Sequence, residues 1–334
     1  MIAAVHFRNF KALRSAAVQL GPFNLLVGPS GSGKTSLIQS LLQLRTLSAL
    51  PVARADELNN QISKGPQIIF DFNPPFNDLR VTLGCSAEDV VCNFLVVTPM
   101  PETVGAEKWP ALRSRLQTIR AFAFDPNAMA LPAKLREGGE LTSNGSTLAA
   151  VLAARRRHVP DQIENLEADF CRIMPEFSGL AFRAVGDEHI ELLARQAAGG
   201  ELIAAQNLSQ GTLHLLAILA LAHAPEPPGI VCIEEVDRGV HPRLLRDVRD
   251  ALYRISHPLP EPGGRVPDQV LATTHSPYLL DLFKDHPEEI ILANKQGNAA
   301  TFERLSDRAD LLELMKESNL GDLWYSGILG AVPG

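Results

Sequence analysis

The sequence has few aromatic residues, few cysteines and no long apolar segment. Aromatic side chains make up 6% of the 334 residues. Apolar runs such as residues 213–222 fall far short of the roughly 20 residues that a membrane-spanning helix needs, which excludes an integral membrane protein. The chain also starts without the charged and apolar regions of a secretory signal. These absences are typical of a cytoplasmic protein, and no membrane association is expected.

The four cysteines show neither a CxxC pair nor a histidine at zinc-ligand spacing. They are Cys85, Cys92, Cys171 and Cys232. We therefore expect four reduced, mostly buried thiols and no zinc site.

The charge balance argues against a protein that coats nucleic acid. The formal net charge is −7, and 46% of the residues are hydrophobic, which is ordinary for a globular chain of this length. No fixed-period repeat and no long low-complexity linker divide the sequence. The densest basic stretch, residues 155–158, is interpreted as a solvated helix end rather than a phosphate-tracking groove.

One segment predicts nucleotide binding. An apolar strand at 23–27 is followed by a Gly-rich turn and then by a helix whose apolar residues recur at helical spacing over 36–44. The turn reads Gly28-Pro29-Ser30-Gly31-Ser32-Gly33-Lys34-Thr35, with Ser36 next. Glycines let successive backbone N–H groups face a phosphate at a helix N-terminus. A Gly/Ser-rich surface turn is the alternative, and the flanking strand and helix disfavour it.

The residue types in this turn match the chemistry of a bound triphosphate. Lys34 would reach the β- and γ-phosphate oxygens, and the Thr35 hydroxyl would bind the Mg²⁺ ion that bridges them. The sequence thus predicts ATP or a related nucleotide with Mg²⁺.

Three further segments carry groups that such a site needs. An apolar strand at 229–233 ends in Glu234, assigned to the metal, and Glu235, assigned to the attacking water. Another strand at 270–274 places His275 at its end, within reach of a terminal phosphate. Ser209, Gln210 and Gly211 precede an apolar helix expected at 212–222, which makes a second anion-binding helix start. Taken singly, each has a plainer interpretation: solvated acids, a structural histidine and a capped helix.

Alternating patterns predict the rest of the architecture. Strands are expected at 2–7, 16–20, 67–72, 79–83 and 90–97, forming an antiparallel layer beside the nucleotide-binding sheet. A mainly helical insertion follows, including a helix from about 160 with one apolar face. We expect an N-terminal ATPase lobe at 1–101, the insertion at 102–178 and a C-terminal lobe at 179–334, together one composite domain.

The order GPSGSGKTS, LSQG, VCIEEVDRGVHP, TTHSP resembles the RecF/SMC-like branch of the ABC ATPases, in particular compact AAA-type ATP-binding proteins. The resemblance covers nearly the whole chain and implies an α/β P-loop NTPase fold with a mainly parallel core sheet. It also implies Walker A at 28–35, the Walker B pair at Glu234 and Glu235, a signature at 209–211 and a switch histidine at His275. In such proteins the signature of one protomer caps the γ-phosphate held by another, so ATP joins a head-to-tail homodimer.

Some positions depart from the family pattern. Glu234 stands where aspartate is more usual, although its longer side chain can reach the magnesium shell through water. Gln210 replaces a glycine and is harmless with an ordinary φ but strained with a positive one. Gln43 and Gln61 are both weak candidates for the Q-loop glutamine.

Three functions compete. The favoured one is an ATP-driven dimerising switch that regulates a DNA-processing or antiphage effector. Since no Toprim nuclease domain follows as in OLD-family nucleases, that effector would be separately encoded and nuclease-like. The second is the ATP-binding subunit of a membrane transporter, which the residues after the LSQG motif disfavour. The third is a DNA-binding clamp, for which a compact basic surface could come from Arg113, Arg115, Arg120, Arg155, Arg156 and Arg157.

Overall fold

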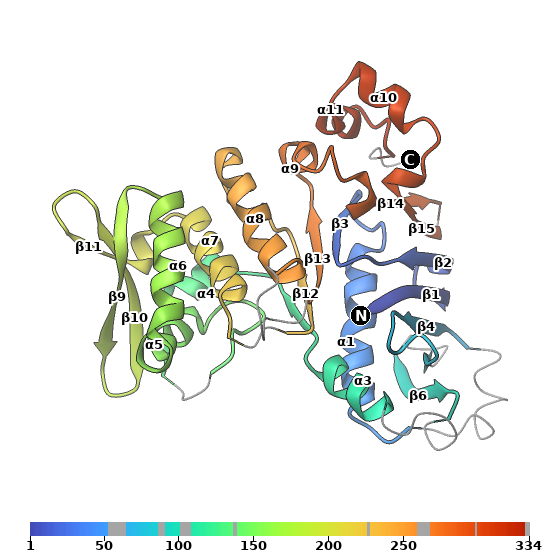
Figure 1. Ribbon diagram of the computed structural model, residues 1–334, viewed down its shortest axis with the longest axis horizontal. Coiled ribbons are helices and arrows are strands. Elements are labelled where there is room, and N and C mark those ends of the chain that lie inside the picture. The colour runs from blue at the N-terminus through green and yellow to red at the C-terminus, as the bar shows by residue number, and fades with distance from the viewer. Residues whose placement is uncertain are drawn as a thin grey trace. The chain divides into compact units, whose positions relative to one another are not determined.

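The computed structural model describes residues 1–52, 65–85, 91–100, 108–135, 139–225, 228–258, 268–297 and 299–330. The chain divides into two units (Figure 1). Unit 1 comprises Met1–Ala121, Pro228–Cys232 and Pro267–Gly334, and unit 2 comprises Phe122–Pro227 and Ile233–Val266. These units do not follow the three sequence segments, because the start of the expected insertion groups with the N-terminal residues.

A six-stranded sheet forms the centre of unit 1, in the order β15-β14-β3-β13-β12-β7. Its members are β3 (Phe23–Val27), β7 (Arg120–Phe122), β12 (Ile230–Ile233), β13 (Gln269–Thr274), β14 (Ile290–Gln296) and β15 (Ala299–Arg304). Strand β3 pairs in parallel with both β13 and β14. All five residues of β3 are buried, as expected for a parallel strand covered on both faces. The predicted α/β architecture with parallel strands is confirmed.

An antiparallel sheet of five strands, in the order β2-β1-β4-β5-β6, forms the second layer of unit 1. Its strands are β1 (Ile2–Phe10), β2 (Leu13–Gln19), β4 (Gln67–Phe72), β5 (Arg80–Cys85) and β6 (Cys92–Thr98). All five were expected from alternation, and only their ends differ. Inward residues such as Val5 and Phe70 are fully buried.

Helix α1 (Lys34–Ser48) provides apolar side chains to the same core as that sheet. Leu37, Ile38, Leu41 and Leu44 recur at helical spacing and are each at most 1% exposed. Helix α3 (Lys108–Gln117) packs beside α1 and adds Leu112 to the core. The C-terminal part of unit 1 contains short helices at α9 (Pro277–Asp281), α10 (Leu311–Glu317) and α11 (Leu320–Tyr325).

Unit 2 combines helices with a small antiparallel sheet. The sheet pairs β9 (Phe177–Val185), β8 (Ala133–Lys134) and β11 (Leu202–Ala204) with β10 (His189–Gln196). The helices are α4 (Pro126–Ala130), α5 (Leu148–His158), α6 (Pro160–Ile173), α7 (Gln210–Ala222) and α8 (Leu245–Ser256). The predicted apolar face of α6 is confirmed. Helix α7 is instead buried on every side from Gly211 to Ala222, because α4, α5, α6 and α8 all pack against it.

The expectation of four reduced thiols is wrong for two of them. Cys85 and Cys92 form a disulfide between β5 and β6, while Cys171 and Cys232 are free. The register of the two strands explains the bond, since it places Cys85 directly opposite Cys92. The residues are seven apart in sequence and match no short motif, so the pairing emerges only once the strands are aligned.

Among the described residues, no helix combines the length and the apolar character needed to cross a membrane.

Candidate functional site

The Gly-rich turn connects β3 to α1 in the predicted strand-turn-helix order. Gly31 and Gly33 have φ of 76° and 97°, a region that favours glycine. A side chain on Gly28 would lie 2.1 Å from the Ala293 carbonyl oxygen of β14, so this position also requires glycine. Nothing lies within 4 Å of a Cβ built on Gly31. The turn is therefore fixed against the sheet at its start and open around Gly31.

Lys34 is the first residue of α1 and folds back over this turn. Its Nζ donates hydrogen bonds of 2.6 Å to the Gly28 carbonyl and 2.9 Å to the Pro29 carbonyl. The side chain is only 8% exposed. An ammonium group held by main-chain oxygens at the centre of the turn is positioned to exchange those partners for phosphate oxygens. Thr35, the next residue, is exposed at the same helix start.

His275 lies at the same edge of the sheet as the turn. Thr274, the last residue of β13, is opposite Val27, the last residue of β3. Gly28 and His275 are therefore the next residues on two neighbouring parallel strands. His275 is exposed, and Ser276 begins α9 as its N-cap. The pairing of β13 with β3 thus places His275 at the strand end next to the Gly-rich turn, and its role at a phosphate stays a prediction.

The LSQG segment forms a capped helix start in unit 2. Ser209 is the N-cap of α7, and its Oγ accepts a 3.0 Å hydrogen bond from the Thr212 backbone N–H. The Ser209 and Thr212 hydroxyls are 2.7 Å apart. Gln210 is not among the residues with positive φ, so the backbone strain considered for it is absent. Ser209 and Gln210 are exposed, whereas α7 is buried from Gly211 to Ala222.

Glu234 and Glu235 follow β12 on a turn that leads to Val240. The Glu234 N–H donates to the Phe122 carbonyl over 2.8 Å. Glu235 has a φ of 50°, which is uncommon for a residue with a side chain and occurs where surrounding structure imposes it. Its carboxylate is exposed and lies 3.7 Å from the Arg238 guanidinium. The turn thus presents the second carboxylate to solvent, whereas Val236 beside it is fully buried.

This turn and the start of α7 are in direct backbone contact. A Cβ on Gly211 would lie 2.4 Å from the Gly239 carbonyl oxygen, and a Cβ on Gly239 would lie 3.2 Å from that of Gln210. Gly239 has a φ of 69°. The signature segment and the carboxylate-bearing turn are therefore packed together within unit 2, a contact that the sequence prediction did not include.

A buried histidine in α7 was also missed. His214 is 0% exposed, and its ring lies edge-on to Phe124 with centroids 5.5 Å apart. Burial lowers the pKa of His214 to about 4, although the Val236 backbone partly opposes this effect. His214 lies within an apolar run, so its sequence context predicts a core position but not its packing against the Glu235 turn.

The six arginines expected to line a DNA-binding surface are divided between the two units. Arg113, Arg115 and Arg120 belong to unit 1, whereas Arg155, Arg156 and Arg157 belong to unit 2. Arg155 donates to the Ala220 carbonyl, and burial lowers its pKa to about 10. Arg156 pairs with Glu167 at 2.6 Å. Tertiary packing therefore occupies side chains that the sequence suggested were solvated.

The oxygen donors predicted from the sequence are of the kind that bind magnesium together with a nucleotide. In the described part of the chain, no cluster of three or more His, Cys, Asp or Glu residues could hold a metal ion. Magnesium bound with a nucleotide needs only one or two protein oxygens, because phosphates and waters supply the rest. Thr35 in unit 1 and Glu234 in unit 2 each carry an oxygen of a type that magnesium accepts.

Of the two candidates for the Q-loop glutamine, only Gln43 lies among the described residues. Gln61 lies outside the described residues. Gln43 lies in α1, eight residues beyond Thr35, which corresponds to about 12 Å along the helix axis. Its Oε1 is buried without a hydrogen-bond partner among the described residues.

Comparison with known proteins places these features in a family. The family described as "AAA domain, putative AbiEii toxin, Type IV TA system" matches residues 105–281, more than half of the chain. An OLD nuclease from Thermus scotoductus (strain ATCC 700910 / SA-01) is 28% identical over 122 residues. That alignment covers 33% of this chain and 22% of the relative, so the chain matches only about a fifth of that protein's length.

Solved structures show a similar fold. An Smc head bound to the C-terminal winged-helix domain of ScpA matches with a TM-score of 0.59 at 14% identity, covering 94% of this chain and 99% of that one. An Smc head from Pyrococcus furiosus with an extended coiled coil, bound to the C-terminal domain of ScpA, gives a TM-score of 0.58 at 13% identity with the same coverage. The fold is thus that of Smc head domains.

Proposed function

We propose, from the premise that this chain belongs to the AAA domain family and is an ABC/RecF/SMC-like ATPase, that it binds and hydrolyses Mg·ATP. The observation that carries this proposal is the phosphate turn with Lys34 bonded to the Gly28 and Pro29 carbonyls. Lys34 and the backbone N–H groups of residues 30–36 bind the phosphates, and Thr35 and Glu234 provide oxygen ligands for Mg²⁺. When bound, the ion neutralises charge on the transferred phosphoryl group.

The remaining residues act on the attacking water and the terminal phosphate. Glu235 accepts a proton from the water or orients it, since it is an exposed carboxylate next to the metal-binding Glu234. His275 hydrogen-bonds the terminal phosphate from the strand end beside Gly28. Glu235 and His275 act only when the nucleotide is bound, and Lys34 and the Gly-rich turn hold it.

We further propose that ATP joins two copies head to tail. Ser209 and the α7 N-terminus offer a hydroxyl, backbone N–H groups and a favourable helix dipole for a partner's γ-phosphate. ATP then favours the dimer and hydrolysis releases it. In this account the dimer regulates a separate DNA-processing effector. The support for that class is the partial likeness to an OLD nuclease and to a toxin-antitoxin family.

Complementation between two inactive variants tests the composite site. Lys34→Met removes the phosphate-binding ammonium, and Ser209→Arg blocks the signature. Each variant alone should release no phosphate from ATP. Mixed together, they should regain activity, because one of the two sites in a mixed dimer combines an intact phosphate turn with an intact signature.

The control is Ser306→Arg, a substitution of an exposed serine far in sequence from these motifs. It should leave ATP hydrolysis unchanged. A mixture of Lys34→Met and Ser209→Arg proteins that stays inactive would refute the composite site. Full activity of Ser209→Arg alone would refute the role of the signature.

A further inference from the structure

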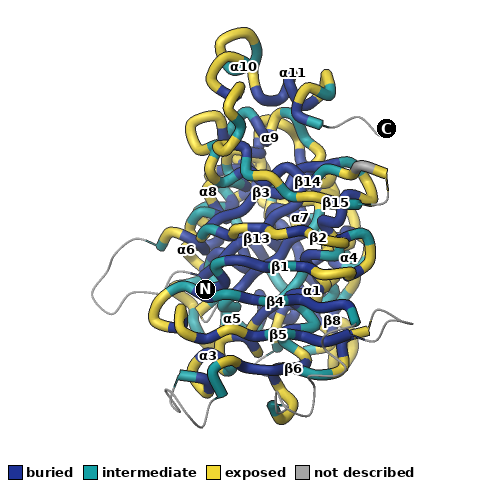
Figure 2. Tube along the Cα trace, turned by 90° about the vertical axis from the view of Figure 1, so that its right-hand side faces the viewer, coloured by how far each residue is buried: buried dark blue, intermediate teal, exposed yellow. Residues whose placement is uncertain are grey.

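A cavity lies on the outward face of the antiparallel sheet of unit 1. It has a volume of about 280 Å³. Its lining comes from β1, β2, β4 and β5 and comprises His6, Phe7, Arg8, Ser15, Ala16, Ala17, Ile69 and Arg80. Buried residues alternate with less buried ones from Val5 to Arg8 on β1 and from Ala16 to Gln19 on β2, two strands that lie side by side in Figure 2. Val5 and Phe7 are core residues, whereas His6 and Arg8 project from the opposite face.

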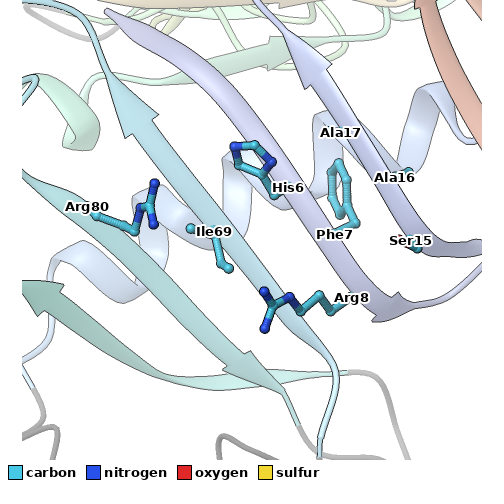
Figure 3. A pocket seen from close by; sticks show the side chains of 8 residues that line it. All are labelled: His6, Phe7, Arg8, Ser15, Ala16, Ala17, Ile69 and Arg80. Atoms are coloured by element: carbon cyan, nitrogen blue, oxygen red, sulfur yellow. The ribbon is translucent and has the colours of Figure 1, made fainter.

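Strand register explains why there is room for a ligand. His6 is opposite Ala17 on β2 and Ile69 on β4, and Arg8 is opposite Ser15. The small side chains on β2 leave space beside the long ones on β1. Figure 3 shows the His6 ring and the Arg8 and Arg80 guanidinium groups arranged around Ile69. The cavity thus has an apolar floor and basic walls.

The charges in this cavity do not cancel. Asp71 is the nearby acid, and Arg80 and His6 already bind its two oxygens at 2.6 and 3.0 Å. Burial would raise the pKa of Asp71, but the hydrogen bonds from Arg80 and His6 outweigh this effect and lower it. Among the described residues, none forms an ion pair or side-chain hydrogen bond with Arg8. One guanidinium therefore remains for a ligand.

The surrounding sequence strengthens the same charge. Residues 2–19, which form β1, β2 and the turn between them, contain three Lys or Arg residues and no aspartate or glutamate, although the whole chain has a net charge of −7. Arg8 and His6 are two residues apart on one strand, which separates their rows by about 7 Å. Guanidinium groups match phosphate oxygens in geometry and charge, and the Ser15 hydroxyl adds a donor.

We infer that this cavity is a second anion site, separate from the nucleotide turn, and that it binds the phosphate group of a phosphate ester. Arg8 is the principal ligand-binding residue, and the Ser15 hydroxyl is a further donor. The phosphate belongs either to a nucleic-acid backbone or to a small phosphorylated molecule. Asp71 holds Arg80 and His6 in place and takes no part in binding.

The test keeps the nucleotide turn occupied with Mg²⁺ and a saturating non-hydrolysable ATP analogue. Binding of a labelled single-stranded oligonucleotide without terminal phosphates is followed by fluorescence anisotropy, and binding of inorganic phosphate by calorimetry. Arg8→Gln should weaken whichever probe binds by about tenfold, the effect of losing a charged hydrogen bond. Arg246→Gln removes an exposed charge from α8 and should change nothing.

A second pair of variants separates charge from shape. Ala17→Glu places a carboxylate opposite His6 and should abolish binding, while Ala17→Gln has nearly the same size and should retain more of it. Binding of the oligonucleotide in an Arg8-dependent manner identifies a nucleic-acid backbone, and binding of phosphate alone identifies a small phosphorylated molecule. If neither probe binds, or if Arg8→Gln and Ala17→Glu leave binding unchanged, the inference is overturned.

Discussion

The buried ring of His214 predicts that unit 2 loses stability in mild acid. In the folded chain burial lowers the pKa of His214 to about 4, whereas an unfolded histidine has a pKa of about 6.5. Between these values the unfolded state binds one more proton than the folded state. The stabilisation is therefore complete above pH 6.5 and is lost progressively as the pH falls toward 4.

The magnitude follows from the two pKa values. Between pH 7.5 and pH 5, the protonation difference at this one ring lowers the free energy of unfolding by about 2 kcal/mol. His214→Met removes the titrating group and keeps an apolar side chain that can fill an irregular space. The altered packing changes the free energy of unfolding by the same amount at every pH, and the substitution also removes the decrease of about 2 kcal/mol between pH 7.5 and pH 5 that His214 causes.

The assay is urea unfolding at pH 7.5 and pH 5, followed by far-ultraviolet circular dichroism. Trp109 and Trp324 both belong to unit 1, so tryptophan fluorescence would not report on unit 2. His189→Gln, at an exposed position of β10, is the control and should keep the wild-type pH dependence. Equal pH dependence in wild type and His214→Met would refute the argument.

Three other substitutions or modifications test separate parts of the structure. Gly211→Ala should destabilise the protein by about 1–3 kcal/mol in urea unfolding, because its Cβ would lie 2.4 Å from the Gly239 carbonyl oxygen; Gln210→Ala beside it should change stability far less, and equal effects would contradict the contact. Lys34→Met should weaken ATP binding about 100-fold, because the ammonium group can no longer donate two charged hydrogen bonds to phosphate oxygens, and circular dichroism checks that the variant is folded. Titration of the denatured, unreduced protein should detect two free thiols, and titration after reduction should detect four. Four free thiols before reduction would disprove the Cys85–Cys92 bond.

Local sequence patterns predicted the strand-turn-helix around the Gly-rich segment and most strands, because each of these depends on neighbouring residues. The run 23–27 is buried and regular, and glycines at 31 and 33 occupy positive φ as the phosphate turn requires. The predicted face of α6 was correct for the same reason: helical spacing alone decides which residues turn inward.

Other features depend on contacts between distant segments, which a single sequence does not display. The Cys85–Cys92 bond needs the register of β5 and β6. The sequence around Arg155 is typical of a solvated helix end. In the structure, however, Arg155 donates a hydrogen bond to the Ala220 carbonyl, because α7 packs against α5. The contact between Gly211 and Gly239 joins two motifs that are 28 positions apart.

The central claim is that ATP joins two copies of this chain, and light scattering of the Glu235→Gln protein tests it most directly. This substitution removes the carboxylate proposed to act on water and leaves the phosphate and metal ligands in place. With Mg²⁺ the account predicts a monomer mass without nucleotide and a dimer mass with ATP, and it predicts that adding Ser209→Arg to the same protein abolishes the dimer. A Glu235→Gln protein that binds ATP and remains a monomer would contradict the account.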